Sequence, residues 1–245
     1  MRNYRVLLVG GILFCAARLF SAPTREVTFM TADSVTIHGT LYLCDGDQKS
    51  PALVLLHMLR HKRQDWDAFA REAVQAGFVV LTIDLRGHGQ SVKCDSRTLD
   101  VKEFSNAEFA AMLEDVKSAV NYLRNEARVD ANCLSLVGAS IGANLALKYA
   151  AMDTAIQSAV LLSPGLEYRG LTTEEAMKTY GTRPALLVAA RDDDYSSDSI
   201  QKLAMLAGGP AKQQLYESAG HGTFMLQAEP GLGKLILDWL KSAAE

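Results

Sequence analysis

The sequence predicts a single α/β domain built on a mostly parallel, doubly wound β-sheet. Short continuous apolar runs recur along the chain, as strands buried on both faces require. Segments with the apolar period of a helix lie between these runs, and no Pro-, Ser- or Gln-rich linker divides the 245 residues. Because strands that alternate with helices form parallel sheets covered on both faces, we expect one layered core.

Composition and charge exclude several classes of protein. Hydrophobic residues make up 49% and charged residues 22% of the chain, which excludes a disordered, collagen-like or coiled-coil protein. The 25 Lys and Arg residues oppose 28 Asp and Glu residues, for a formal net charge of -3, and no basic block occurs. An electrostatic nucleic-acid binder is therefore disfavoured, and we expect a small-molecule substrate.

Residues 1–22 have the outline of a signal peptide. Two early arginines precede an apolar run, Val6–Ala17, and the small residues Ser21 and Ala22 follow. The run is shorter than the ~20 residues of a spanning helix, so no stable membrane span is expected. We therefore expect export to the periplasm or the cell exterior, with residues 23–245 forming the α/β domain.

Two alternatives remain open for this segment. Cys15 would carry a lipid anchor, although Phe14 stands where a small residue is expected, and a segment that is not a signal would leave the protein cytoplasmic. Elsewhere only Cys44, Cys94 and Cys133 occur, too few for a disulfide-stapled fold. Cys44 and Cys94 lie in turn-rich stretches and would be the pair to join after export.

The first predicted element is an antiparallel hairpin at one sheet edge. Val27–Thr31 and Val35–Cys44 alternate apolar and polar residues on either side of Ala32-Asp33-Ser34. The buried parallel strands then follow as continuous apolar runs: Ala52–His57, Phe78–Asp84, Cys133–Gly138, Ala159–Ser163 and Ala185–Ala190. A more polar run, Lys212–Glu217, is expected to be the last strand.

Helical periods fill the intervals between the strands. They run from Trp66 to Val74 and from Phe109 to Leu123, and the second is preceded by a capping box of Ser105 and Glu108. Leu232–Leu240 is expected to be a closing helix.

The segment Pro164–Arg183 is too short for a large lid domain. It holds one helical candidate, near Thr172-Thr173-Glu174-Glu175. With little to exclude bulk water, we expect an acyl group held at the site to pass to water.

Gly138-Ala139-Ser140-Ile141-Gly142 predicts a nucleophilic serine. The motif follows a strand-like run and opens a helical stretch, the context of a G-x-S-x-G elbow. A strained turn raises Ser140 above the sheet, and the two glycines let strand and helix approach. Without that context the motif would fit an ordinary strand–helix turn equally well.

A serine hydroxyl needs a base, and chain order selects one. Of five histidines only His221 follows the elbow, in a loop after the predicted last strand. In the serine–acid–histidine order of this architecture it is the expected base; otherwise it is a solvent-exposed loop residue.

The acid is expected after the strand Ala185–Ala190, where three aspartates stand together. Asp193 is the first choice, followed by Asp192 and then Asp194, because it stands third after the strand. The other two would cap a helix or face water.

A tetrahedral intermediate needs two backbone donors. The amides of Ile141, which follows the nucleophile, and Met58, which follows the first parallel strand, are the candidates. His57 is expected to support this loop by hydrogen bonding.

Asp84-Leu85-Arg86-Gly87-His88-Gly89 is expected to be a structural loop rather than a metal or phosphate site, because its glycines do not open a helix. Tyr168, Trp66 and Met225 are expected either to line a substrate pocket or to pack in the core.

These motifs together resemble the α/β-hydrolase family from about Thr24 onward, including the run IDLRGHGQS. The resemblance implies the α/β-hydrolase fold, with Ser140, an aspartate near 193 and His221 as the triad and the amides of Met58 and Ile141 as the oxyanion hole. The stretches HMLRHKRQDW and SIGAN look most like small, lidless dienelactone-hydrolase-like or carboxylesterase-like members. The dienelactone hydrolases have a cysteine nucleophile in place of Ser140, and a glycine usually stands at Met58.

The expected activity is hydrolysis of carboxylic esters or related acyl compounds through an acyl-enzyme, in the EC 3.1.1 class, without cofactor or metal. A peptidase or acyltransferase would use the same triad, and a non-catalytic binding protein would use only the fold. The sequence leaves oligomeric state open.

Overall fold

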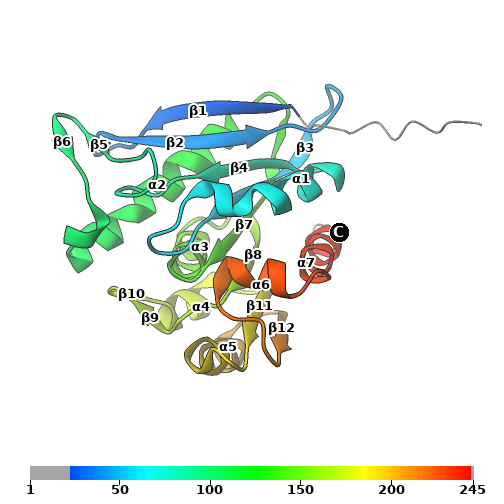
Figure 1. Ribbon diagram of the computed structural model, residues 1–245. Helices are drawn as coiled ribbons and strands as arrows, with labels where there is room; N and C mark the ends of the chain where they lie inside the picture. Colours follow the sequence, from blue (N-terminus) through cyan, green and yellow to red (C-terminus); the bar gives the residue numbers. More distant parts are fainter. Residues whose placement is uncertain (1–22, 244–245) are drawn as a thin grey trace, which may run out of the picture.

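The computed structural model describes residues 23–243, and the expected signal peptide lies outside them. Figure 1 shows a central sheet with helices on both sides. The predicted mostly parallel sheet with an N-terminal antiparallel hairpin is confirmed. In the described part of the chain the main sheet has ten strands. Strand β1 (Thr24–Met30) pairs with β2, and the others follow the order β12 (Ala211–Tyr216), β11 (Ala185–Ala190), β8 (Ile156–Leu162), β7 (Val129–Ala139), β3 (Ser50–Leu56), β4 (Val79–Ile83), β2 (Val35–Tyr42), β5 (Lys93–Cys94) and β6 (Arg97–Thr98).

The strands from β12 to β4 run parallel, whereas β1, β2, β5 and β6 are antiparallel additions at one end. The short β5–β6 ladder was not expected. Two-residue strands of polar residues show too little alternation to be recognised from sequence.

Helices cover the sheet on two faces and divide the core in two. Along β3 successive side chains alternate between the cores, since neighbouring strand residues face opposite ways. One core packs beneath α2 (Asn106–Arg124), α3 (Ile141–Met152), α4 (Glu174–Tyr180) and α5 (Asp194–Leu206). The other packs beneath α1 (Asp67–Gln75), the short α6 (Met225–Ala228) and α7 (Leu232–Ser242).

Most helix boundaries follow local signals. The Ser105–Glu108 capping box is present in both directions at the start of α2. Helix α5 was not expected; it begins within the run of aspartates, where Asp193 is the N-cap. Short 3-10 turns occur at Arg63–Trp66, Val101–Glu103 and Gly222–Phe224.

Between β8 and α4 the chain forms a small hairpin of β9 (Glu167–Tyr168) and β10 (Leu171–Thr172). The segment Pro164–Arg183 therefore holds this hairpin and α4.

The thiols of Cys44, Cys94 and Cys133 are free, so the pairing considered for the first two is not formed. Among the described residues, no helix is both long and apolar enough to cross a membrane.

Candidate active site

The predicted site residues lie on loops at the carboxyl ends of neighbouring parallel strands. Met58 follows β3, Ser140 follows β7, Asp193 follows β11 and His221 follows β12. Loops from this edge of a parallel sheet form the usual binding crevice of open α/β folds.

Ser140 stands at a sharp strand–helix turn with φ 54° and ψ -120°. Such a backbone costs on the order of 1–3 kcal/mol for a non-glycine residue and persists only where its surroundings hold it. The Ser140 amide donates to the Leu162 carbonyl at 2.8 Å, and the amides of Ala143 and Asn144 in the first turn of α3 donate to the Ser140 carbonyl at 2.9 and 3.2 Å. The turn is therefore held from both sides.

The glycines two residues before and after Ser140 are required by space. A Cβ on Gly138 would overlap the Gly142 carbonyl, and a Cβ on Gly142 would overlap the carbonyl of Leu56 in β3. Side chains at either position would force α3 away from the sheet, which explains the G-x-S-x-G spacing physically.

His221 is paired with Asp193. The distance from His221 Nδ1 to Asp193 Oδ2 is 2.6 Å, and the side chains are 37% and 16% exposed. With Nδ1 donating to the carboxylate, Nε2 is the nitrogen left to act as a base.

Asp193 also caps α5, because its Oδ1 accepts the Ser196 amide at 3.4 Å. Burial acts to raise the pKa of Asp193, but the hydrogen bonds from His221 and Ser196 outweigh it and the pKa is lowered. The helix N-terminus favours the same charged form.

The two neighbouring aspartates have other positions. Asp192 accepts hydrogen bonds from Ser218 Oγ and from the amides of Ala219 and Gly220, so it anchors the loop that leads to His221. Asp194 is the first residue of α5. Of the three carboxylates, only that of Asp193 contacts His221.

The loop that carries His221 packs against the serine turn. The Gly222 amide donates to Ser163 Oγ at 2.8 Å. Gly222 has φ 60°, and a Cβ there would overlap the Met58 sulfur and lie 3.5 Å from the Cβ of Ala139, the residue before Ser140. Within residues 23–243 no hydrogen bond joins His221 to Ser140 directly, and such bonds often tighten only when substrate binds.

Both residues that carry the candidate oxyanion donors are buried. Met58 is 2% exposed and Ile141 is fully buried. Neither amide has a hydrogen-bond acceptor among residues 23–243. Each of these two amides therefore has an unused hydrogen-bonding capacity.

His57 supports the Met58 loop. Its Nδ1 lies 2.7 Å from the Met58 carbonyl, and its Nε2 accepts the Leu85 amide at 3.0 Å. An accepting Nε2 requires the neutral tautomer with the proton on Nδ1. Complete burial, with the nearby His88, lowers the pKa of His57 to about 3, so this imidazole stays neutral and structural.

The loop after β4 is held by buried ion pairs. The Asp84 carboxylate accepts the Arg63 amide at 2.8 Å and pairs with the Arg63 guanidinium. Arg86 pairs with Asp115 at 2.8 Å, and a Cβ on Gly89 would overlap Asp84. These contacts agree with a structural loop, and the described residues contain no group of three or more His, Cys, Asp or Glu side chains arranged to hold a metal.

Of the three residues considered for a substrate pocket, Trp66 and Met225 are fully buried in the core. Tyr168 is half-buried and contacts the His221 ring edge-on, with centroids 6.4 Å apart. Sequence reasoning missed Ser163 and Ser196, which hold Gly222 and Asp193. Neither serine belongs to a sequence motif. The only signals are that Ser163 follows a strand and that Ser196 lies in the first turn of a helix.

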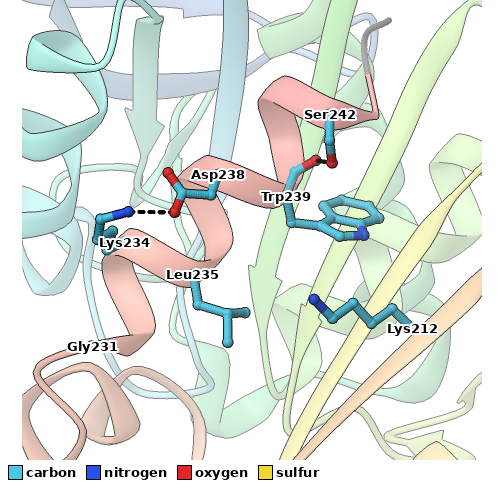
Figure 2. A pocket seen from close by; sticks show the side chains of 7 residues that line it. All are labelled: Lys212, Gly231, Lys234, Leu235, Asp238, Trp239 and Ser242. Carbon is cyan, nitrogen blue, oxygen red and sulfur yellow. Dashed lines mark hydrogen bonds and ion pairs between the residues drawn. The ribbon is translucent and has the colours of Figure 1, made fainter.

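A cavity of about 450 Å³ lies elsewhere, between α7 and β12. Figure 2 shows Trp239 and Leu235 on α7 beside it and Lys212 on β12 across from them. None of the predicted site residues lines this cavity.

Comparison with known proteins places this geometry in context. The sequence profile of the family described as "Serine aminopeptidase, S33", a hydrolase family, matches residues 47–191, more than half of the chain. "Thiohydrolase aneE" of Aspergillus aculeatus is 28% identical over 184 residues, covering 74% of this chain and 55% of that protein. "Quorum-quenching protein AidA" of Acinetobacter baumannii is 27% identical over 213 residues, covering 86% of this chain and 64% of that protein. The chain thus spans less than two thirds of either relative.

Among solved structures, a dienelactone hydrolase from Anabaena variabilis superposes with a TM-score of 0.75 at 18% identity, covering 92% of this chain and 100% of that one. At this identity the likeness extends to the fold alone.

Proposed function

The chain belongs to the serine aminopeptidase S33 family of α/β hydrolases, and from this premise we propose that it is a serine hydrolase of carboxylic esters or related acyl compounds, with Ser140, Asp193 and His221 as its triad. The observation that carries the proposal is the Asp193–His221 pair. Gly222, which follows His221, packs against Ala139. The next residue, Ser140, has a strained backbone and opens α3. This arrangement supplies an acid, a base and a nucleophile from three strand ends.

In the proposed reaction His221 Nε2 takes the Ser140 proton as Oγ bonds to the acyl carbon. The resulting oxyanion accepts hydrogen bonds from the amides of Met58 and Ile141. As the intermediate collapses, the bond to the leaving group breaks and His221 protonates it. Water, deprotonated by His221, then attacks the acyl-enzyme. As this second intermediate collapses, the bond from the acyl carbon to Ser140 Oγ breaks, His221 returns the proton to Oγ, and the acid is released.

The similar proteins support an acyl substrate. The aligned relatives include a protein described as a thiohydrolase. We therefore include thioesters among the proposed substrates. A peptidase is the second candidate, favoured by the family description as a serine aminopeptidase.

Export is part of the proposal, resting on the signal-like residues 1–22. N-terminal sequencing of the protein from its own cells tests it: a mature chain starting near residue 23 is expected, whereas an intact Met1 in the cytoplasmic fraction would contradict it.

The activity is tested with p-nitrophenyl esters of increasing acyl length, an acyl thioester and an aminoacyl p-nitroanilide, each with the wild-type protein and Ser140→Ala. We expect turnover of esters or thioesters that is lost in Ser140→Ala. We also expect a fluorophosphonate to label Ser140 in the wild type. Turnover of the anilide alone would favour the peptidase, and absence of both turnover and labelling would favour a non-catalytic protein.

A further inference from the structure

The β9–β10 hairpin is tied to both helices that begin at the site. Asn144, one turn after Ser140 on α3, donates to the Leu171 carbonyl at 2.8 Å and accepts the Gly165 amide at 3.0 Å. The Tyr195 hydroxyl, on α5 next to the Asp193 cap, lies 2.9 Å from both the amide and the carbonyl of Glu167. The hairpin therefore has little freedom to move relative to Ser140 and Asp193.

This anchored hairpin carries Tyr168 onto the candidate acid–base pair. The Tyr168 ring meets the His221 ring edge-on, at 6.4 Å and 89°, and the Tyr195 ring at 5.6 Å and 72°. An edge-to-face arrangement of this kind is favourable and orients both rings. The imidazole is thus restrained by Asp193 at Nδ1 and by Tyr168 at its side.

The Tyr168 hydroxyl lies among groups that hold the site together. It is 3.3 Å from Ser196 Oγ and 3.4 Å from the Ser163 carbonyl. The Ser196 amide donates to Asp193, and Ser163 Oγ accepts the amide that follows His221. Burial, with the nearby Asp193 charge, raises the pKa of Tyr168 to about 12, while the hydrogen bond with Ser196 acts the other way. The phenol is therefore neutral at neutral pH.

Gly165 makes room for this arrangement. A Cβ at Gly165 would lie only 2.7 Å from ring atoms of both Tyr168 and Tyr195. Any side chain there would push the two rings apart, so a Gly165 variant shifts Tyr168 without removing it.

We propose that Tyr168 is a positioning residue, whose ring covers the Asp193–His221 pair and keeps the imidazole turned toward Ser140. This inference rests on the proposed function. The short β9–β10 hairpin lies over the acid–base pair and shields it from water, in a site that no large lid among residues 23–243 covers.

The test compares Tyr168→Ala, Tyr168→Phe and Gly165→Ala in the full protein. If the ring positions His221, Tyr168→Ala lowers kcat about 10- to 100-fold with little change in KM, because small displacements of a catalytic group cost rates of this order. Tyr168→Phe, which keeps the ring, restores most of kcat, and Gly165→Ala lowers it in the same direction as Tyr168→Ala. Tyr122→Ala is the matched control, because it removes another half-buried tyrosine. Tyr122 lies away from the site and stacks on Phe29, with ring centroids 5.2 Å apart.

A second readout does not depend on turnover. The far-downfield proton resonance of His221 Nδ1–H, hydrogen-bonded to Asp193, is expected in the wild type and in Tyr168→Phe, and is expected to broaden through solvent exchange in Tyr168→Ala. Far-ultraviolet circular dichroism verifies that each variant is folded.

Three results would overturn the inference: full kcat in folded Tyr168→Ala, a loss confined to KM, or an equal loss in Tyr168→Phe. The second would make Tyr168 a wall of the substrate pocket, and the third would assign the role to its hydroxyl. Fluorophosphonate labelling of Ser140 in the wild type separates these results from failure of the proposed function, since labelling requires an activated serine whatever Tyr168 does.

Discussion

At the scale of single residues, three adjacent aspartates of equal chemistry occupy different positions. Asp193 contacts His221 and caps α5, Asp192 anchors the loop from Ser218 to Gly220, and Asp194 begins the helix. The roles differ because the chain turns sharply between β11 and α5, so successive side chains leave in different directions.

This division predicts the effects of replacing each aspartate by asparagine. Asp193→Asn is expected to lower kcat by about 10³- to 10⁴-fold, because an amide donor at this place favours the wrong imidazole tautomer. Asp194→Asn is the matched control and is expected to keep wild-type kcat. Steady-state kinetics on the best ester substrate checks both, and the assignment fails if the two variants exchange places.

Motif context and chain order single out Ser140 and His221 as candidates, but chain order does not distinguish among three neighbouring aspartates. Strand–turn–helix context identifies the serine, and only one histidine follows it. The contact between a given carboxylate and His221 depends on backbone angles at the turn, such as ψ 74° at Asp193, which have no signal in the sequence.

At the scale of elements, helix starts depend on local hydrogen bonds that the sequence displays. The Ser105 hydroxyl accepts the Glu108 amide, and the Glu108 carboxylate accepts the Ser105 amide at 2.8 Å. Residue types alone predict this capping box, because a serine and a glutamate stand three residues apart ahead of an apolar helical period. No side-chain cap is present where α4 and the 3-10 turn after His221 begin. The sequence therefore predicts the start of α4 only roughly and does not predict the 3-10 turn.

A variant without the capping box is expected to be less stable but as active as the wild type. Ser105→Ala is expected to lower the free energy of unfolding by about 1 kcal/mol, because one helix amide loses its acceptor. Ser105→Thr keeps the cap and is expected to lose much less. Urea unfolding measures both; an Ala variant as stable as the Thr variant would mean that the box contributes nothing.

At the scale of the whole molecule, buried arginines join the N-terminal hairpin to the rest of the domain. Arg86 reaches Asp33 in the hairpin turn at 2.6 Å and Asp115 on α2 at 2.8 Å. Arg63 likewise joins Glu26 on β1 at 2.6 Å to Asp84 after β4. These pairs tie the antiparallel end of the sheet to the loop behind the candidate site.

The Asp33–Arg86 pair predicts part of the acid sensitivity of the fold. Hydrogen bonding to Arg86 lowers the pKa of Asp33 to about 2. Because the folded-state pKa is lowered, this contribution to stability is present above the unfolded-state pKa and is lost as pH falls toward about 2. Asp33→Asn is expected to lower stability at neutral pH by less than about 1 kcal/mol, since Asp33 is partly solvated.

The same variant is also expected to flatten the decline of stability in acid. Urea unfolding at neutral pH and at steps down to pH about 2 measures this. A decline as steep as that of the wild type would assign the acid sensitivity to other carboxylates.

The sequence by itself determined the layered α/β fold, the order of the main strands along the chain, the serine elbow and the candidate base. These features depend on apolar periodicity, on glycine at fixed spacing and on chain order, all of which are local or one-dimensional. Only the tertiary structure decided which aspartate meets His221, that Ser163 and Ser196 hold the site together, and that Tyr168 lies over the acid–base pair. Those contacts join residues far apart in sequence or depend on the exact angle of a turn, and no local pattern of residue types encodes either.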